Sequence, residues 1–172
     1  MPAEYPCEVS KMVQVELREA PAFLVMGKRT WIADVEDFHI FWDRSHADGT
    51  IDRLIKVSGE PGPVTKGYAF GISRVEKDPA IRTFDFYIAA EVADQDRVPE
   101  DFEHFMVPEA TWAVFECHGE MLKALYEAEM YAFTQWLPAS EYEHALAPEL
   151  EVYPTKDSQC VQFWLPVVKK VG

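Results

Sequence analysis

Residues 136–154 read WLPASEYEHALAPELEVYP and connect an amphipathic helix to a short strand. Pro138 is expected to end the helix and Pro148 to precede the strand, because proline fits the interior of neither element. Successive side chains of a strand point to opposite faces, so Glu151 and Tyr153 share one face and the aliphatic residues between them share the other. The segment therefore predicts a carboxylate and an aromatic ring together on one face of a sheet.

The helix before this segment is rich in aromatic residues, among them Tyr126, Tyr131 and Trp136. Aromatic faces and a carboxylate both attract positive charge, so this combination predicts a pocket for an organic cation. The alternative is that Glu149 and Glu151 are solvated residues of a half-exposed strand, since glutamate is rarely buried without a partner.

The rest of the chain predicts two similar halves after a tail at residues 1–11. Alternation of apolar and polar residues indicates strands, and spacings of three and four indicate helices. Asp34 is the expected N-cap of the first helix, and an acidic loop at 93–103 separates the halves. The first half is expected to contain strands at 13–18, 22–27, 67–73 and 84–92 and helical segments at about 35–42 and 51–55. The second is expected to contain strands at 111–117, 149–153 and 160–168 and a helix from about residue 120.

The order strand, helix, strand, strand thus occurs twice, at about 12–92 and 102–170. This order predicts an α+β fold in one domain, residues 1–172, with a mostly antiparallel sheet and helices on one face. Two such halves side by side leave a central cleft between their helices, which is a usual place for a ligand.

The composition restricts the classes of partner. The chain has 172 residues, 48% of them hydrophobic and 13% aromatic, and a formal net charge of −14. Such an acidic chain is a poor match for direct nucleic-acid binding or for anionic membranes, both of which need basic side chains. A negative field does attract cations. The aromatic excess is consistent with a lined cavity or with core packing alone.

The cysteines and the N-terminus predict a cytoplasmic protein. Cys7, Cys117 and Cys160 are odd in number and widely spaced, which is typical of reduced thiols rather than a disulfide framework. The first residues do not resemble a signal peptide, and no apolar run approaches the roughly 18 residues of a membrane span.

Motifs for metals and cofactors are incomplete. His118 and Glu120 form an H-x-E pair, but no P-C-x-x-C follows, and no His or Cys pair has the sequence spacing of a zinc site. Asp94 and Asp96 begin like a calcium loop that does not continue. Gly67 and Gly71 lie in a strand pattern and predict a close approach or a bulge rather than a phosphate cradle. We expect no metal and no cofactor, with haem ligation by one of the five scattered histidines left open.

Three stretches carry a resemblance to a known family. They are VELREAPAFLVMG at 15–27, FYIAAEV at 86–92, and WLPASEYE with PELEVYP in 136–154. Together with the doubled order of elements, they resemble the GyrI-like family, the effector-binding domain of AraC-type and MerR-type (BmrR-like) multidrug regulators. SOUL-type haem-binding proteins share this fold, so the fold alone does not specify the ligand.

The resemblance implies a cleft between the halves that accepts bulky, aromatic, often cationic compounds. The family's acidic residue on the strand before the last one matches Glu151 here. Aromatic residues of the second long helix and the neighbouring strands would form the walls. By element, these are Tyr126 and Trp136, followed by Tyr68, Tyr87, Trp112 and Phe163.

Three functions follow from the resemblance. The first is a standalone module that senses or sequesters lipophilic cationic small molecules. The second is a hydrolase of cyclopropane-bearing genotoxins that uses Glu151 as general base, so whether the chain is an enzyme stays open. The third is an inhibitory protein that acts on a partner such as gyrase or a transcription regulator. We favour the first.

Overall fold

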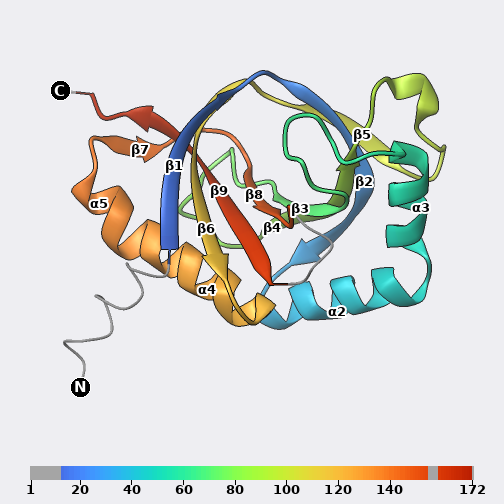
Figure 1. The fold of residues 1–172 in the computed structure, drawn as a ribbon, viewed down its shortest axis with the longest axis horizontal. Coiled ribbons are helices and arrows are strands. Elements are labelled where there is room, and N and C mark those ends of the chain that lie inside the picture. Colours follow the sequence, from blue (N-terminus) through green and yellow to red (C-terminus); the bar gives the residue numbers. More distant parts are fainter. Residues whose placement is uncertain (1–12, 155–158, 172) are drawn as a thin grey trace.

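The computed structural model describes residues 13–154 and 159–171, so the predicted N-terminal tail with Cys7 lies outside the described part. The described chain forms one antiparallel sheet of nine strands, with helices along one side of it (Figure 1). The α+β architecture expected from the sequence is confirmed. The strands are β1 (Val13–Ala20), β2 (Phe23–Ile32), β3 (Phe70–Ser73), β4 (Phe84–Glu91), β5 (Glu103–Val107), β6 (Ala110–His118), β7 (Tyr142–His144), β8 (Glu149–Val152) and β9 (Cys160–Lys169).

The strand order is β1-β6-β9-β8-β3-β4-β2-β5, with β7 paired to β9. The first half contributes β1 to β4, and the second contributes β5, β6, β8 and β9. The four strands of the first half correspond, in chain order, to the four of the second. If each strand is replaced by its counterpart, the same order is obtained when the sheet is read from the opposite edge. The two halves pair with each other in the middle of the sheet, where β3 pairs with β8, and towards its edges, where β1 pairs with β6 and β2 with β5. This order is compatible with the predicted pair of halves, whose duplication stays a prediction.

A long helical segment follows the first two strands of each half. The first is α2 (Val35–Ala47), which continues through Gly49 into α3 (Thr50–Ser58). The second is α4 (Met121–Tyr131), extended by a π-helical turn (Ala132–Trp136) and by the short α5 (Leu137–Ala139). A 3₁₀ turn at Gln95–Arg97 lies in the acidic loop. In Figure 1, α2 and α4 lie along the same side of the sheet.

The start of α2 is built as the sequence predicts. The Asp34 side chain accepts a hydrogen bond from Glu36 N at 2.9 Å, and the Asp37 side chain accepts one from Asp34 N at 3.1 Å. This capping box satisfies backbone donors that the first helical turn leaves without partners. Backbone donors, with Ala33 first, lower the pKa of Asp37.

Some boundaries differ from the sequence expectation. β5 and β7 were not predicted, because β5 is a largely exposed strand at the sheet edge without a clear apolar alternation. The strand expected at 67–73 begins only at Phe70. The helical segment that Pro138 is expected to end continues one residue past it, to Ala139, and Ser140 follows in an extended conformation.

The core has three parts, one on the inner face of the sheet and two beneath the helices. Phe84, Phe86 and Ile88 pack in the cluster beneath α2 and α3, whereas Tyr87 belongs to the cluster on the other face. This alternation in β4 is the one that the sequence predicts. A third cluster, with Phe115 and Phe163, lies beneath α4. The two helical units are thus packed separately over one continuous sheet.

Candidate ligand-binding site

A cavity of about 780 Å³ lies between the α2–α3 unit and α4, where β8 meets the first half of the sheet. Its size is within the range of small-molecule sites. Most of its lining is apolar, and it includes three acidic side chains, those of Asp43, Glu129 and Glu151. The lining residues are Val35, Phe38, His39, Trp42, Asp43 and His46 of α2, Ile51 and Ile55 of α3, Tyr68 and Ala69 before β3, Met121, Leu122, Leu125, Tyr126 and Glu129 of α4, and Glu151 and Tyr153 around β8.

Glu151 is buried at the floor of this cavity, with 8% of its surface exposed. Its Oε1 accepts hydrogen bonds from Trp42 Nε1 at 3.0 Å and from the Tyr153 hydroxyl at 3.2 Å. Burial nevertheless raises the pKa of Glu151 to about 7, because the two neutral donors offset only part of the lost hydration. Within residues 13–154 and 159–171, no basic side chain forms an ion pair with this carboxylate.

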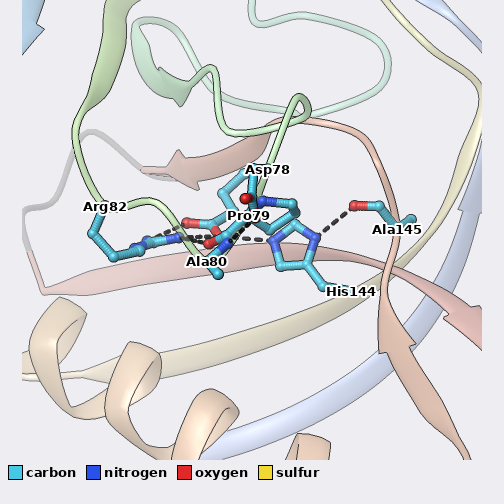
Figure 2. Close-up of polar contacts among 7 residues, drawn as sticks. Asp78, Pro79, Ala80, Arg82, His144 and Ala145 are labelled. Atoms are coloured by element: carbon cyan, nitrogen blue, oxygen red, sulfur yellow. Dashed lines mark hydrogen bonds and ion pairs between the residues drawn. The ribbon is translucent and has the colours of Figure 1, made fainter.

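Glu149, two residues earlier on the same strand face, is also buried but has cationic partners. Arg82 donates to both of its oxygens, at 2.9 and 2.8 Å, and His144 Nε2 lies 2.8 Å from its Oε2. Figure 2 shows Arg82 and His144 approaching from opposite sides. Burial acts to raise the pKa of Glu149, but the hydrogen bonds from Arg82 and His144 hold it below its ordinary value.

The alternative that both glutamates are solvated strand residues is therefore wrong. Of the two buried carboxylates on β8, Glu149 forms ion pairs within the protein, whereas Glu151 has hydrogen bonds but no ion pair with any residue that the structure describes. The two carboxylates of one strand face are thus compensated differently.

Glu129 on α4 is another acidic residue of the cavity wall. Burial, together with the nearby charges of Glu151 and Glu149, raises the pKa of Glu129 to about 8, against a smaller opposite effect of Arg82. Two carboxyl groups of raised pKa therefore share one apolar cavity. Such perturbed groups in a cavity are typical of functional sites.

Aromatic rings hold the floor of the cavity in place. Trp42 packs edge-on against Tyr153, with ring centroids 5.7 Å apart, and Phe38 packs edge-on against Phe86 at 4.9 Å. Tyr126, with 63% of its surface exposed, lies on the lining contributed by α4. The edge-on contact between Trp42 and Tyr153 packs the two donors of Glu151 against each other.

Gly71 leaves the space that the Glu151 side chain fills. The two residues are paired across β3 and β8. A Cβ atom at position 71 would lie 2.5 Å from Cγ of Glu151 and 2.5 Å from Cζ of Phe86, which is closer than real Cβ contacts. Of the two alternatives that the sequence leaves open at Gly71, the structure has the close approach, made here by the side chains of Glu151 and Phe86.

Three of the predicted site residues line the cavity, namely Glu151, Tyr126 and Tyr68. Tyr68 reaches it because regular strand structure begins only at Phe70. In an extended strand from residue 67, Tyr68 would share the face of Phe70 and Ile72, which pack on the opposite side of the sheet. Loss of regular alternation thus moves one aromatic side chain into the cavity.

Four predicted residues lie outside the cavity lining. Tyr87 faces the other side of the sheet and donates its hydroxyl to Glu103 at 3.1 Å. Trp112 is fully buried on that side against Trp164. The remaining two pack against Phe115 beneath α4, with ring centroids 5.3 Å away for Trp136 and 6.4 Å for Phe163.

Sequence reasoning missed several lining residues, above all Trp42 and Glu129. Trp42 has the spacing of a core-facing helical residue, and 109 positions separate it from the carboxylate to which it donates. Glu129 falls on the apolar stripe of α4. Its position among apolar residues could have indicated that it faces a cavity, because glutamate is rarely buried without a partner.

The Arg82–Glu149 pair predicts a specific stability effect. Arg82→Ala is expected to destabilise the fold by about 2 kcal/mol, because it leaves a buried carboxylate with His144 as its remaining partner. We expect a smaller loss of stability than for a fully buried ion pair, because 46% of the Arg82 side chain is exposed. The urea unfolding midpoint measures it. Lys169→Ala, which removes the exposed pair with Glu141, is the control and should change stability by less than about 0.5 kcal/mol. Equal midpoints for the two variants would contradict the expectation.

A comparison with protein families connects this geometry to known proteins. The sequence model of the Cass2 family, integron-associated effector binding proteins, matches residues 16–167. The chain belongs to this family. The match includes both helical units, the β3–β8 junction and Glu151, so the Cass2 family domain and the cavity-bearing fold are the same unit. The expected GyrI-like relationship is confirmed.

Solved structures show the same fold as this Cass2 family member. SAV2435 bound to tetraphenylphosphonium has a TM-score of 0.71 and 19% identity, covering 90% of this chain and 94% of that one. The EcmrR C-terminal domain has a TM-score of 0.63 and 19% identity, covering 92% and 99%. The integron cassette protein VCH_CASS2 of Vibrio cholerae has a TM-score of 0.62 and 14% identity, covering 90% and 95%.

Two further findings are negative. A search of curated proteins found no match to this Cass2 family member. Among its described residues, every helix is too short or too polar to cross a membrane.

Proposed function

We propose that this protein binds bulky lipophilic cations in the cavity between α2 and α4, as a standalone sensor or sequestering module. The observation that carries the proposal is the buried Glu151 carboxylate, which faces an apolar cavity of about 780 Å³ and has no cationic partner among the described residues. That SAV2435 was solved with tetraphenylphosphonium in the same fold supports this class of ligand.

The physical basis is compensation of a desolvated charge. An ionised carboxylate is unfavourable in an apolar site unless it is paired. A lipophilic cation would supply the missing charge without a large cost of its own dehydration. Contacts with aromatic faces such as Trp42 and Tyr126 would contribute about 0.5–2 kcal/mol each. Binding energy would then come from charge and burial rather than from directional hydrogen bonds.

This source of energy predicts broad selectivity. The lining offers few polar groups besides the carboxylates, so shape and charge would select the ligand more than hydrogen-bonding pattern. Flat or propeller-shaped aromatic cations that fill the cavity would all satisfy Glu151. We therefore propose a ligand class, bulky drug-like aromatic cations, rather than a single compound.

We extend the proposal to a partner protein. A transcription regulator would recognise the ligand-bound form of this domain. EcmrR, whose C-terminal domain shares this fold, was solved in a complex with DNA. The acidic chain itself is a poor candidate for direct DNA contact. Gyrase as an alternative partner stays a prediction from the sequence resemblance.

Hydrolysis is the second candidate function. A carboxylate whose pKa is about 7 is suited to general-base work at neutral pH, and Glu151 has that property inside a cavity. Turnover would appear as a product of higher mass by one water molecule when an electrophilic cyclopropane is the substrate. Unchanged substrate in mass spectrometry, with the same compound shown to bind, would assign the cavity to binding alone.

The proposal is tested by calorimetric titration of the full chain at pH 8. Tetraphenylphosphonium is expected to bind once per chain in the micromolar range, and neutral triphenylphosphine oxide, which is similar in shape, at least about tenfold more weakly. Absence of binding by tetraphenylphosphonium, rhodamine 6G and a third aromatic cation would overturn the proposal. Equal affinities for the neutral and charged compounds would show that the positive charge of the ligand does not contribute to binding.

A further inference from the structure

A second group of chemically active side chains lies at the far end of the β6–β9 ladder. His118 at the end of β6 is paired directly with Cys160 at the start of β9, and Glu116 is paired with Gln162. Residues two apart on a strand share a face, so the three side chains of Glu116, His118 and Cys160 point to the same side of the sheet. Cys117, between two of them, belongs to the core on the opposite side, beneath α4.

Sequence spacing did not predict this group. His118 and Cys160 are 42 positions apart, and zinc motifs are usually recognised by ligands a few residues from each other. Here the residues are brought together by the antiparallel pairing of β6 and β9, which places residues from distant parts of the chain directly opposite each other.

The geometry of the group matches a small coordination sphere. One ligand atom from each residue, a carboxylate oxygen, a ring nitrogen and the thiol sulfur, lies within 4.8 Å of the others. Glu116 Oε2 and His118 Nε2 are 3.3 Å apart. For zinc bond lengths, the edge of a tetrahedron is about 3.3 Å between oxygen and nitrogen and about 3.6 Å to sulfur. The Glu116–His118 distance already matches such an edge, and the other separations exceed theirs by at most about 1.2 Å.

Other side chains already orient the carboxylate. Gln162 Nε2 donates to Glu116 Oε1 at 2.9 Å, and Trp164 Nε1 donates to Gln162 Oε1 at 3.0 Å. These bonds occupy the oxygen that faces away from His118 and leave Oε2 for the group. Hydrogen-bonded supports of this kind are typical of metal-ligating carboxylates.

We propose that Glu116, His118 and Cys160 form a zinc-binding site with water as the fourth ligand. The set of one thiolate, one imidazole and one carboxylate favours Zn²⁺ over the oxygen-preferring Mg²⁺ and Ca²⁺. The ion enters from solvent, because 59% of the His118 side chain is exposed while Cys160 is buried. On binding, the Cys160 thiol loses its proton to solvent and the sulfur takes the bond to zinc.

The site would also influence the helix that lines the ligand cavity. β6 ends at His118, and α4 begins at Met121, which is part of the cavity lining. A bound ion would fix the end of the β6–β9 ladder and the turn through Gly119. The zinc proposal does not depend on the cation-binding function, and either one can fail without the other.

The test uses Co²⁺ as a spectroscopic substitute for zinc, added to the reduced full-length protein. The wild type is expected to show thiolate-to-cobalt charge-transfer absorption and the visible bands of tetrahedral Co²⁺, both abolished by one equivalent of Zn²⁺. Cys160→Ser should lose the charge-transfer absorption and His118→Ala should weaken binding at least about tenfold. Cys117→Ser, which changes the thiol on the other face, should retain the spectrum.

A second measurement separates binding from misfolding. Zinc should raise the unfolding temperature of the wild type and of Cys117→Ser, but not that of Cys160→Ser, because binding to the folded state alone stabilises it. Absence of a cobalt–thiolate band in the wild type would overturn the proposal. A band that persists in Cys160→Ser, with normal circular dichroism, would overturn it as well.

Discussion

Glu151→Gln is expected to weaken the binding of tetraphenylphosphonium by about 100-fold or more at pH 8. Removing one partner of a buried charge pair costs about 3–5 kcal/mol, and about 1.4 kcal/mol corresponds to a factor of ten. The amide keeps the size of the side chain and an oxygen to accept the hydrogen bonds of Trp42 and Tyr153. The loss therefore measures the charge alone. Calorimetry of the wild type and variant under the same conditions gives the ratio.

Glu103→Gln is the matched control. It removes one negative charge from the same net charge of −14, but Glu103 accepts from Tyr87, which packs on the opposite face of the sheet. Its affinity should stay within about twofold of the wild type, since long-range fields are screened by salt. If both variants lose affinity equally, the effect comes from the overall field of the protein, and Glu151 is not the counter-charge.

Stability provides a second control for the Glu151 variant. Burial raises the folded-state pKa of Glu151 above its ordinary value of 4.5, so the folded chain keeps a proton that the unfolded chain releases. Stability of the ligand-free protein therefore falls as pH rises from about 4.5 to about 7. In Glu151→Gln the side chain does not ionise, so this loss of stability with rising pH should be absent. At pH 8 the variant should unfold at a temperature no lower than the wild type, so lost binding cannot be attributed to unfolding.

Affinity for the cation is expected to rise by about 100-fold between pH 5 and pH 8. With the pKa of Glu151 at about 7, only about 1% of this carboxyl is ionised at pH 5 and most of it at pH 8. A cation favours the ionised form, so it binds more tightly as pH rises and releases a proton when it binds near neutral pH. Glu129, with a pKa of about 8, should extend the rise to higher pH.

Titrations at several pH values, in buffers of different ionisation enthalpy, measure both the affinity and the proton release. In Glu151→Gln the rise below pH 7 should disappear, and in Glu129→Gln it should remain while the part above pH 7 is reduced. A wild-type affinity that is constant from pH 5 to pH 8 would contradict this linkage. It would mean that the carboxyl is already ionised in the empty cavity or does not contact the cation.

Local patterns were sufficient for much of the fold. The alternation of β4 was predicted with the correct faces, and Asp34 was predicted as the cap of α2, because both depend on neighbours within a few residues. Edge strand β5 was missed because its exposed residues lack the alternation that a half-buried strand shows. Pro138 was predicted to end the long helical segment, and the segment ends one residue later, at Ala139.

The aromatic residues show where such patterns stop. Trp112 and Tyr87 belong to the expected strands but face the inner core, and Tyr68 reaches the cavity only because the backbone before β3 is irregular. Which face of a sheet covers a cavity and which covers a core is set by how the helices pack. A one-residue change of register exchanges these faces.

The sequence by itself determined the α+β class, the helix cap and the placement of Glu151 with Tyr153 on one face, because each follows from spacing along the chain. The tertiary structure decided the chemistry of the two β8 carboxylates. Arg82, 67 positions from Glu149, neutralises that residue, while Trp42, 109 positions from Glu151, donates a hydrogen bond without a charge. Charge compensation depends on contacts between distant segments, and those contacts exist only once β3 pairs with β8 and the helices pack over the junction.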